Sequence, residues 1–87
     1  MTQRYHIMET EWGDVNVDAD WYDANEQAAL DKVYPPYMDR SQYAKGVKWV
    51  VDEFEFAVFK MARRWSWQMR QRGDNPSNYL WSPEGDK

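Results

Sequence analysis

A long stretch at residues 41–72 constrains the fold of this chain most, because its apolar residues recur with the spacing of an α-helix. The helix-capping pattern Asp39-Arg40-Ser41-Gln42 begins it, and Gly73, a common stop signal, follows it. At about 100° per residue, one face gathers enough apolar side chains to pack against a domain: Tyr43, Val47, Val50, Val51, Phe54, Ala57, Val58, Met61, Ala62, Trp65 and Met69. We therefore predict one long amphipathic helix.

Two features inside this stretch also fit a different structure. Gly46 weakens a helix, and Phe54-Glu55-Phe56-Ala57-Val58 alternates as a strand does. A strand there would shorten the helix to residues 60–72 and would give a three-stranded sheet with two helices. We favour the long helix and keep the strand as the alternative.

The same helix carries a second apolar stripe, which we call the aromatic row: Trp49, Phe56 and Trp67. The row lies about 120° or more from the centre of the first face, among basic residues: Lys45, Lys60, Arg63 and Arg70. A surface helix of a small protein needs only one apolar face, so the second predicts binding to a partner. Alternatively, the hairpin and the tail wrap around the helix and cover both faces.

A β-hairpin is predicted before the long helix, with strands at residues 4–10 and 14–19 and a turn at Trp12-Gly13. The second strand alternates between small apolar and polar residues. Its inner face would carry Val15, Val17 and Ala19, and its solvent face would carry Asp14, Asn16, Asp18 and Asp20.

A short helix is predicted to begin at Asp23-Ala24-Asn25-Glu26, which is close to a capping box, and to end before Pro35-Pro36. After Gly73 the tail contains further helix breakers, and Tyr79-Leu80-Trp81 is expected to dock back on the domain. The predicted fold is a single α+β domain at residues 1–73, made of the hairpin, the short helix and the long helix. An irregular tail at residues 74–87 follows.

Few chemistries are open to a chain of 87 residues with no Cys and a single His. Disulfides are excluded, and His6 has no Ser or Cys nucleophile nearby in the sequence. Residues 14–20 place oxygen donors at alternate positions, as a calcium loop does. However, Ala19 stands where that loop needs Gly, and Asn25 where it needs a carboxylate. We therefore expect no enzyme activity, no metal site and no cofactor.

The chain contains no apolar run of about 18 residues and no signal-like start, so we expect a soluble cytoplasmic protein without membrane contact. A chain this short builds only a marginal hydrophobic core. Together with the aromatic row, this predicts a homodimer, paired through the long helix or an edge strand, that buries more than about 1,000 Å² in total.

Charge is divided unevenly along the chain. Residues 1–39 hold nine acids and two bases, a net charge of −7, whereas residues 40–87 hold six acids and nine bases, a net charge of +3. The basic and aromatic segment at residues 60–72 has the composition to hold phosphates and stack on unpaired bases. A small nucleic-acid-binding accessory protein is therefore the alternative function, although the overall acidity opposes it.

As a whole, this compact acidic chain without Cys and rich in Trp and Tyr resembles small phage-encoded proteins that bind and block host enzymes or defence complexes. The resemblance is compositional and rests on no motif. It implies a non-catalytic inhibitor that binds a host protein through an acidic face, as a DNA mimic, or through the aromatic row. The residues expected at the partner are Asp14, Asp18, Asp20, Asp23, Trp49, Phe56, Lys60, Arg63 and Trp67.

Overall fold

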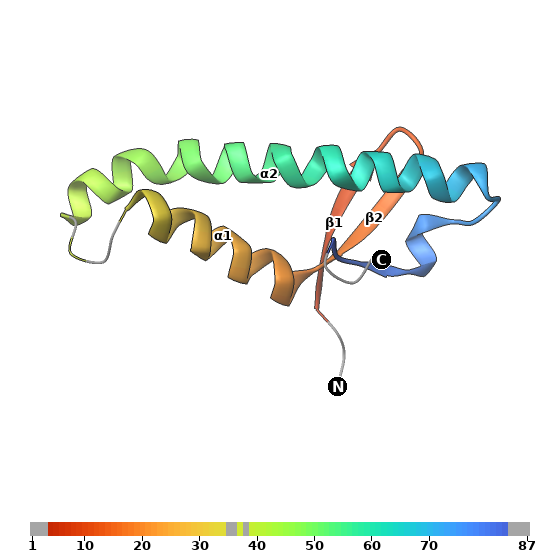
Figure 1. Cartoon of the computed structure of the whole chain (residues 1–87), viewed down its shortest axis with the longest axis horizontal. Coiled ribbons are helices and arrows are strands. Elements are labelled where there is room, and N and C mark those ends of the chain that lie inside the picture. Colours follow the sequence, from red (N-terminus) through yellow and green to blue (C-terminus); the bar gives the residue numbers. More distant parts are fainter. Residues whose placement is uncertain (1–3, 35–36, 38, 84–87) are drawn as a thin grey trace.

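The computed structural model describes residues 4–34, 37 and 39–83, with the backbone alone at residues 40 and 42–45. In chain order its elements are β1 (Tyr5–Thr10), β2 (Gly13–Asp18), α1 (Ala19–Val33), α2 (Arg40–Gln71), a 3-10 helix η1 (Pro76–Asn78) and β3 (Leu80–Trp81) (Figure 1). The predicted α+β fold, with a hairpin, a short helix, a long helix and an irregular tail, is confirmed. The strand alternative for residues 54–58 is wrong, because these residues lie inside α2.

Helix α2 determines the shape of the molecule. Its 32 residues span about 48 Å, and the longest dimension of the molecule is 49 Å. Helix α1 lies beside the N-terminal half of α2, and the hairpin and the segment after α2 lie beside its C-terminal half (Figure 1). Each half of α2 therefore has its own packing partner.

Both ends of α2 carry the predicted signals. The Asp39 carboxylate accepts a hydrogen bond from the Ser41 N–H at 3.2 Å, which caps the first turn. At the other end, the N–H of Gly73 donates to Arg70 and the N–H of Asp74 donates to Met69, at 3.0 and 2.9 Å. This paired arrangement needs a left-handed residue, and Gly73 supplies it with φ +83°.

The hairpin pairs β1 and β2 antiparallel, from Tyr5 opposite Asp18 to Thr10 opposite Gly13. Gly13 has φ +126°, and a Cβ at this position would lie 3.1 Å from Cγ of Pro76. The turn therefore requires glycine both for its backbone conformation and for the close approach of η1.

Helix α1 begins four residues earlier than the sequence pattern predicted. The second strand ends at Asp18, whose carboxylate accepts hydrogen bonds from the N–H groups of Asp20 and Trp21 at 3.0 and 3.4 Å. This cap begins the helix at Ala19, so Asp20 lies on α1 and not on a strand. The pattern at Asp23 and Glu26 lies within the helix.

The core lies between the sheet and the C-terminal half of α2. Its buried residues are Val15, Val17, Tyr22, Val58, Ala62, Trp65, Met69 and Trp81. Strand β3 runs parallel to β2, with Val17 opposite Trp81. The Trp81 ring centroid lies 5.9 Å from that of Trp65 and 6.5 Å from that of Trp21, so β3 completes the core.

Gly46 is explained by a close contact between the two helices. A Cβ at Gly46 would lie 1.5 Å from the Tyr34 hydroxyl oxygen and 2.2 Å from Cζ of the same ring. A residue that weakens the helix locally therefore makes room for the Tyr34 side chain.

Candidate protein-interaction surfaces

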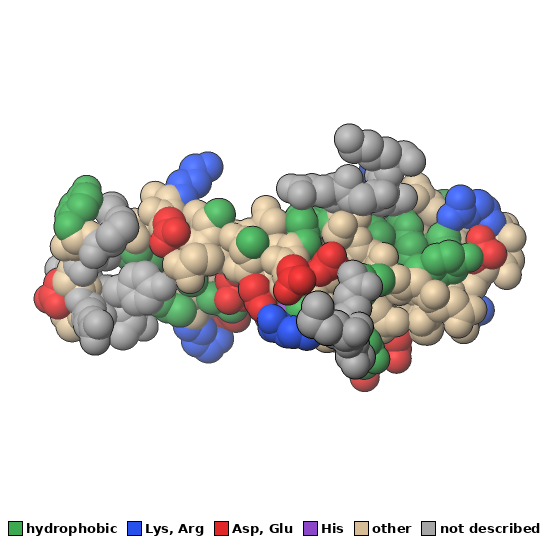
Figure 2. All heavy atoms as spheres, turned by 90° about the horizontal axis from the view of Figure 1, so that it is seen from below, with side chains coloured by type: hydrophobic (Ala, Val, Ile, Leu, Met, Phe, Trp, Pro, Cys, Tyr) green, Lys and Arg blue, Asp and Glu red, His purple; other side chains and the backbone are tan. Residues whose placement is uncertain are grey.

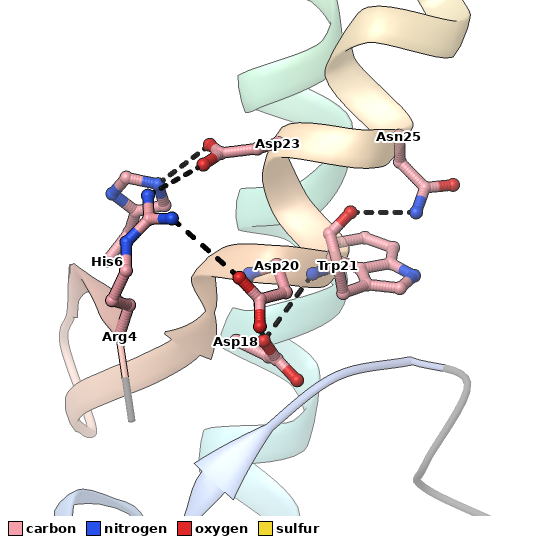
Figure 3. A network of polar contacts seen from close by, with 7 residues as sticks. All are labelled: Arg4, His6, Asp18, Asp20, Trp21, Asp23 and Asn25. Carbon is pink, nitrogen blue, oxygen red and sulfur yellow. Dashed lines mark hydrogen bonds and ion pairs between the residues drawn. The ribbon is translucent and has the colours of Figure 1, made fainter. Parts of the chain in front are cut away.

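Three of the four predicted acidic site residues, Asp18, Asp20 and Asp23, lie in a network of polar contacts where the hairpin meets α1 (Figure 3). Arg4 donates a hydrogen bond to Asp23 at 2.9 Å, and its guanidinium lies 3.8 Å from the Asp20 carboxylate. The Nε2 atom of His6 lies 3.1 Å from the Asp23 carboxylate. The contact with His6, reinforced by Arg4, lowers the pKa of Asp23.

The predicted acidic residues Asp14 and Asp18 both lie on β2 but have different surroundings. Asp18 caps α1 with its carboxylate. Asp14 lies on the exposed side of β2, opposite Glu9 of β1. Figure 2 accordingly shows acidic side chains beside basic ones on the lower face of the molecule. Asp18, Asp20 and Asp23 each make a contact within the fold.

The aromatic row lies on the face of α2 opposite the core. Trp49, Phe56 and Trp67 are 64%, 59% and 44% exposed, whereas Val58 and Trp65, about half a turn away, are buried. Within the described part of the chain, the hairpin and the segment after α2 pack on the first face and leave the row open. The alternative in which they cover both faces is therefore wrong.

Two predicted basic residues flank the row. The Lys60 ammonium lies 4.8 Å from the centroid of the Phe56 ring, within cation–π range. Arg63 lies 4.8 Å from the centroid of the Trp12 ring and forms a hydrogen-bonded ion pair with Glu11, which raises its pKa.

The hairpin turn is a neighbour of the row that the sequence analysis missed. Besides the contacts of Glu11 and Trp12 with Arg63, the Trp12 carbonyl accepts a hydrogen bond from Nε of Arg70 at 2.8 Å. These contacts join residues more than fifty positions apart, and no local spacing signals them.

A groove runs between β1 and α2, on the flank of the row. It has a volume of about 480 Å³ and is lined by Ile7, Met8, Glu9, Asp52, Glu55, Phe56 and Phe59. Its charged lining residues are all carboxylates, and Ile7 is exposed. The groove is suited to apolar groups that carry positive charge.

The described residues include no group of three or more His, Cys, Asp or Glu side chains placed to hold a metal ion. In the same part of the chain, no helix is long and apolar enough to cross a membrane. His6 is held between Asp23 and Tyr22, whose ring centroid lies 4.7 Å away, at the surface of the sheet.

Comparisons with protein-family models, curated proteins and solved structures find no match. The surfaces of the molecule are therefore the basis for a proposal about function.

Proposed function

We propose that this protein is a non-catalytic binding protein that attaches to another protein through the aromatic row of α2. One observation carries the proposal: three large aromatic side chains lie exposed on the helix face that points away from the core. Full burial of such a side chain contributes about 1.5–3 kcal/mol, and Trp and Arg are enriched among residues that dominate interface energies.

In this proposal the acidic residues have a secondary role in binding. Asp18 is engaged as a helix cap, and Asp20 and Asp23 lie against Arg4. Carboxylates that already have partners are poorly placed to replace a nucleic-acid backbone in a basic groove. The acidic N-terminal half would instead speed the encounter with a basic partner, because exposed charges act mainly on association.

The class of partner comes from the compositional resemblance alone. If the protein acts as the small phage-encoded inhibitors do, the partner is a host enzyme or a defence complex, which the protein blocks by occupying part of its surface. Nucleic acid remains the second candidate, since exposed Lys60, Arg64 and Arg70 lie in the C-terminal half of α2.

The experiment that tests the proposal is affinity capture from a host lysate, followed by quantitative mass spectrometry. The test variant is Trp49→Ala/Phe56→Ala/Trp67→Ala, and the matched control is Tyr5→Ala, which removes an exposed aromatic side chain from β1. We expect the wild type and the control to retain the same proteins and the test variant to lose them. Equal capture by all three would refute the binding of a host protein through the row.

A charge variant separates the two candidate functions. Replacing Asp14, Asp18 and Asp20 by Asn should slow association with a protein partner, and wild-type affinity should fall as salt rises. For nucleic acid, the same variant should bind more tightly, and Arg63→Ala or Arg70→Ala should lower the salt slope by about one. Tighter binding of the triple variant to DNA or RNA would show that nucleic-acid binding, the second candidate function, is the correct one.

A further inference from the structure

The exposed face of α2 carries a longer regular pattern than the aromatic row alone. Starting at Trp49, the residues along this face recur alternately after four and three positions, which is the spacing of a coiled-coil seam. We call this set the α2 seam: Trp49, Glu53, Phe56, Lys60, Arg63 and Trp67. All six side chains are exposed, so a second helix has access to them.

The α2 seam is complementary to itself when two copies run in opposite directions. If a two-fold axis passes the helix at the level of Val58, each seam position falls opposite another seam position. Trp49 meets Trp67 of the second copy, Glu53 meets Arg63, and Phe56 meets Lys60. The contacts match by type, as ring on ring, acid on base and ring on cation.

Charge selects this direction over the parallel one. The acid Glu53 precedes the centre of the seam, and the base Arg63 follows it. In an antiparallel pair Glu53 therefore faces Arg63 of the second copy, whereas Asp52 and Arg64 lie on opposite flanks of the seam and do not meet. A parallel pair would place each of these charges against its own copy, which is unfavourable.

The core residues Val58, Ala62 and Trp65 lie on the side of α2 opposite the seam. The hairpin lies along one flank of the seam, where Glu11 and Trp12 contact Arg63, and the other flank is open to a second helix. Contact from Trp49 to Trp67 would run for about 27 Å of helix, with four Trp rings at its two ends. A stable interface needs about 1,000 Å² in total, and a chain with a marginal core gains stability from such burial.

We propose that the protein forms an antiparallel homodimer through the α2 seam. This inference rests on the proposed function, the binding of a protein by the aromatic row, and names a second copy of the chain as that protein.

Sedimentation velocity tests the self-association. The wild type should be dimeric at roughly 100 µM, and Trp49→Ala/Trp67→Ala should raise the dimer dissociation constant at least about tenfold. Tyr5→Ala should leave it unchanged, and circular dichroism should show that all variants keep their helix content. A monomeric wild type at this concentration would overturn the inference.

A charge exchange tests the direction. Glu53→Arg places two bases opposite each other on either side of the two-fold axis and should raise the dissociation constant about tenfold. Arg63→Glu should do the same with two acids, and it also removes the ion pair with Glu11 in each copy. The double variant Glu53→Arg/Arg63→Glu restores opposite charges across the seam and should recover most of the wild-type affinity, whereas a further loss would overturn the antiparallel pairing.

These results separate the inference from the proposed function. If the wild type is monomeric but the variant of the aromatic row still loses the proteins captured by Tyr5→Ala, then a foreign partner occupies the row. In that case the homodimer is wrong and the proposed function stands. If the wild type is monomeric and capture is also unchanged, both are wrong.

Discussion

The Tyr22 ring makes edge contacts with two other rings at the edge of the core. It is 8% exposed, and its ring centroid lies 4.7 Å from that of His6 and 5.1 Å from that of Phe54. Burial, together with the nearby carboxylates of Glu55, Glu26 and Asp23, raises the pKa of Tyr22 to about 12. The folded state therefore holds the phenol proton more tightly than the unfolded chain does.

This pKa predicts a loss of stability in alkali. The contribution of Tyr22 is fully present below the unfolded value of 10 and is lost as pH rises through 12. Between these pH values the wild type should lose about 2–3 kcal/mol of unfolding free energy more than Tyr22→Phe, which cannot ionise. Urea unfolding at a series of pH values measures the difference. If the unfolding free energies of the two proteins change in parallel with pH, the raised pKa of Tyr22 is wrong.

Gly46 and Tyr34 allow a second test at single residues. Gly46→Ala should destabilise the protein by about 1–3 kcal/mol, because the new methyl group meets the Tyr34 ring. In a Tyr34→Ala background the same substitution should instead stabilise it by about 0.5–1 kcal/mol, the ordinary preference of a helix for Ala. The double-mutant cycle is measured by denaturant unfolding. If Gly46→Ala changes the unfolding free energy with the same sign in both backgrounds, the contact with Tyr34 is not the reason for glycine at this position.

At the scale of elements, the Asp18 carboxylate marks the boundary between β2 and α1. Asp18 is the last residue of the strand and the N-cap of the helix, so its side chain satisfies N–H groups that have no partner in the first turn. The position that the sequence analysis assigned to an acidic binding face therefore has a structural role as well.

The cap predicts an asymmetry between neighbouring acids. Asp18→Ala should lower the free energy of unfolding by about 1 kcal/mol, whereas Asp18→Asn should cost little because the amide oxygen also caps. Asp14→Ala is the control, since its carboxylate lies on the exposed face of the same strand. Thermal unfolding of the three variants measures their order of stability. Equal effects at Asp14 and Asp18 would contradict the capping role.

At the scale of the whole molecule, the segment after α2 joins its end to the hairpin. Strand β3 pairs with β2, Ser77 Oγ donates to the Asp14 carbonyl at 3.1 Å, and Trp81 fills the core at 4% exposure. The segment at residues 74–83 is therefore part of the folded unit.

Two adjacent residues of β3 test this role. Trp81→Ala should cost about 3–5 kcal/mol, because it removes a buried ring between Trp65 and Trp21. Leu80→Ala, at a position 37% exposed, should cost under about 1 kcal/mol. Chemical denaturation compares the two variants. A similar cost for both would mean that the segment contributes only through its backbone.

Patterns within a single element were sufficient to predict most of the fold. Three signals in α2 act within a few residues: its helical period, its capping residue Asp39 and its terminal Gly73. In the structure the helix has this period and lies between these two residues. The same period separated the aromatic row from the core face. Both are local properties of one helix, and a sequence displays such properties directly.

Contacts between distant segments were decided only by the tertiary structure. The start of α1 depended on where the pairing of β2 with β1 ends, which leaves Asp18 as the cap. The need for Gly46 depended on where the Tyr34 ring lies. The turn residues Glu11 and Trp12 meet Arg63 and Arg70 because the hairpin folds over the end of α2. The exposure of the aromatic row likewise depended on which distant segments pack on α2. A helical period shows that a second face exists, but whether another segment covers it depends on how the whole chain packs.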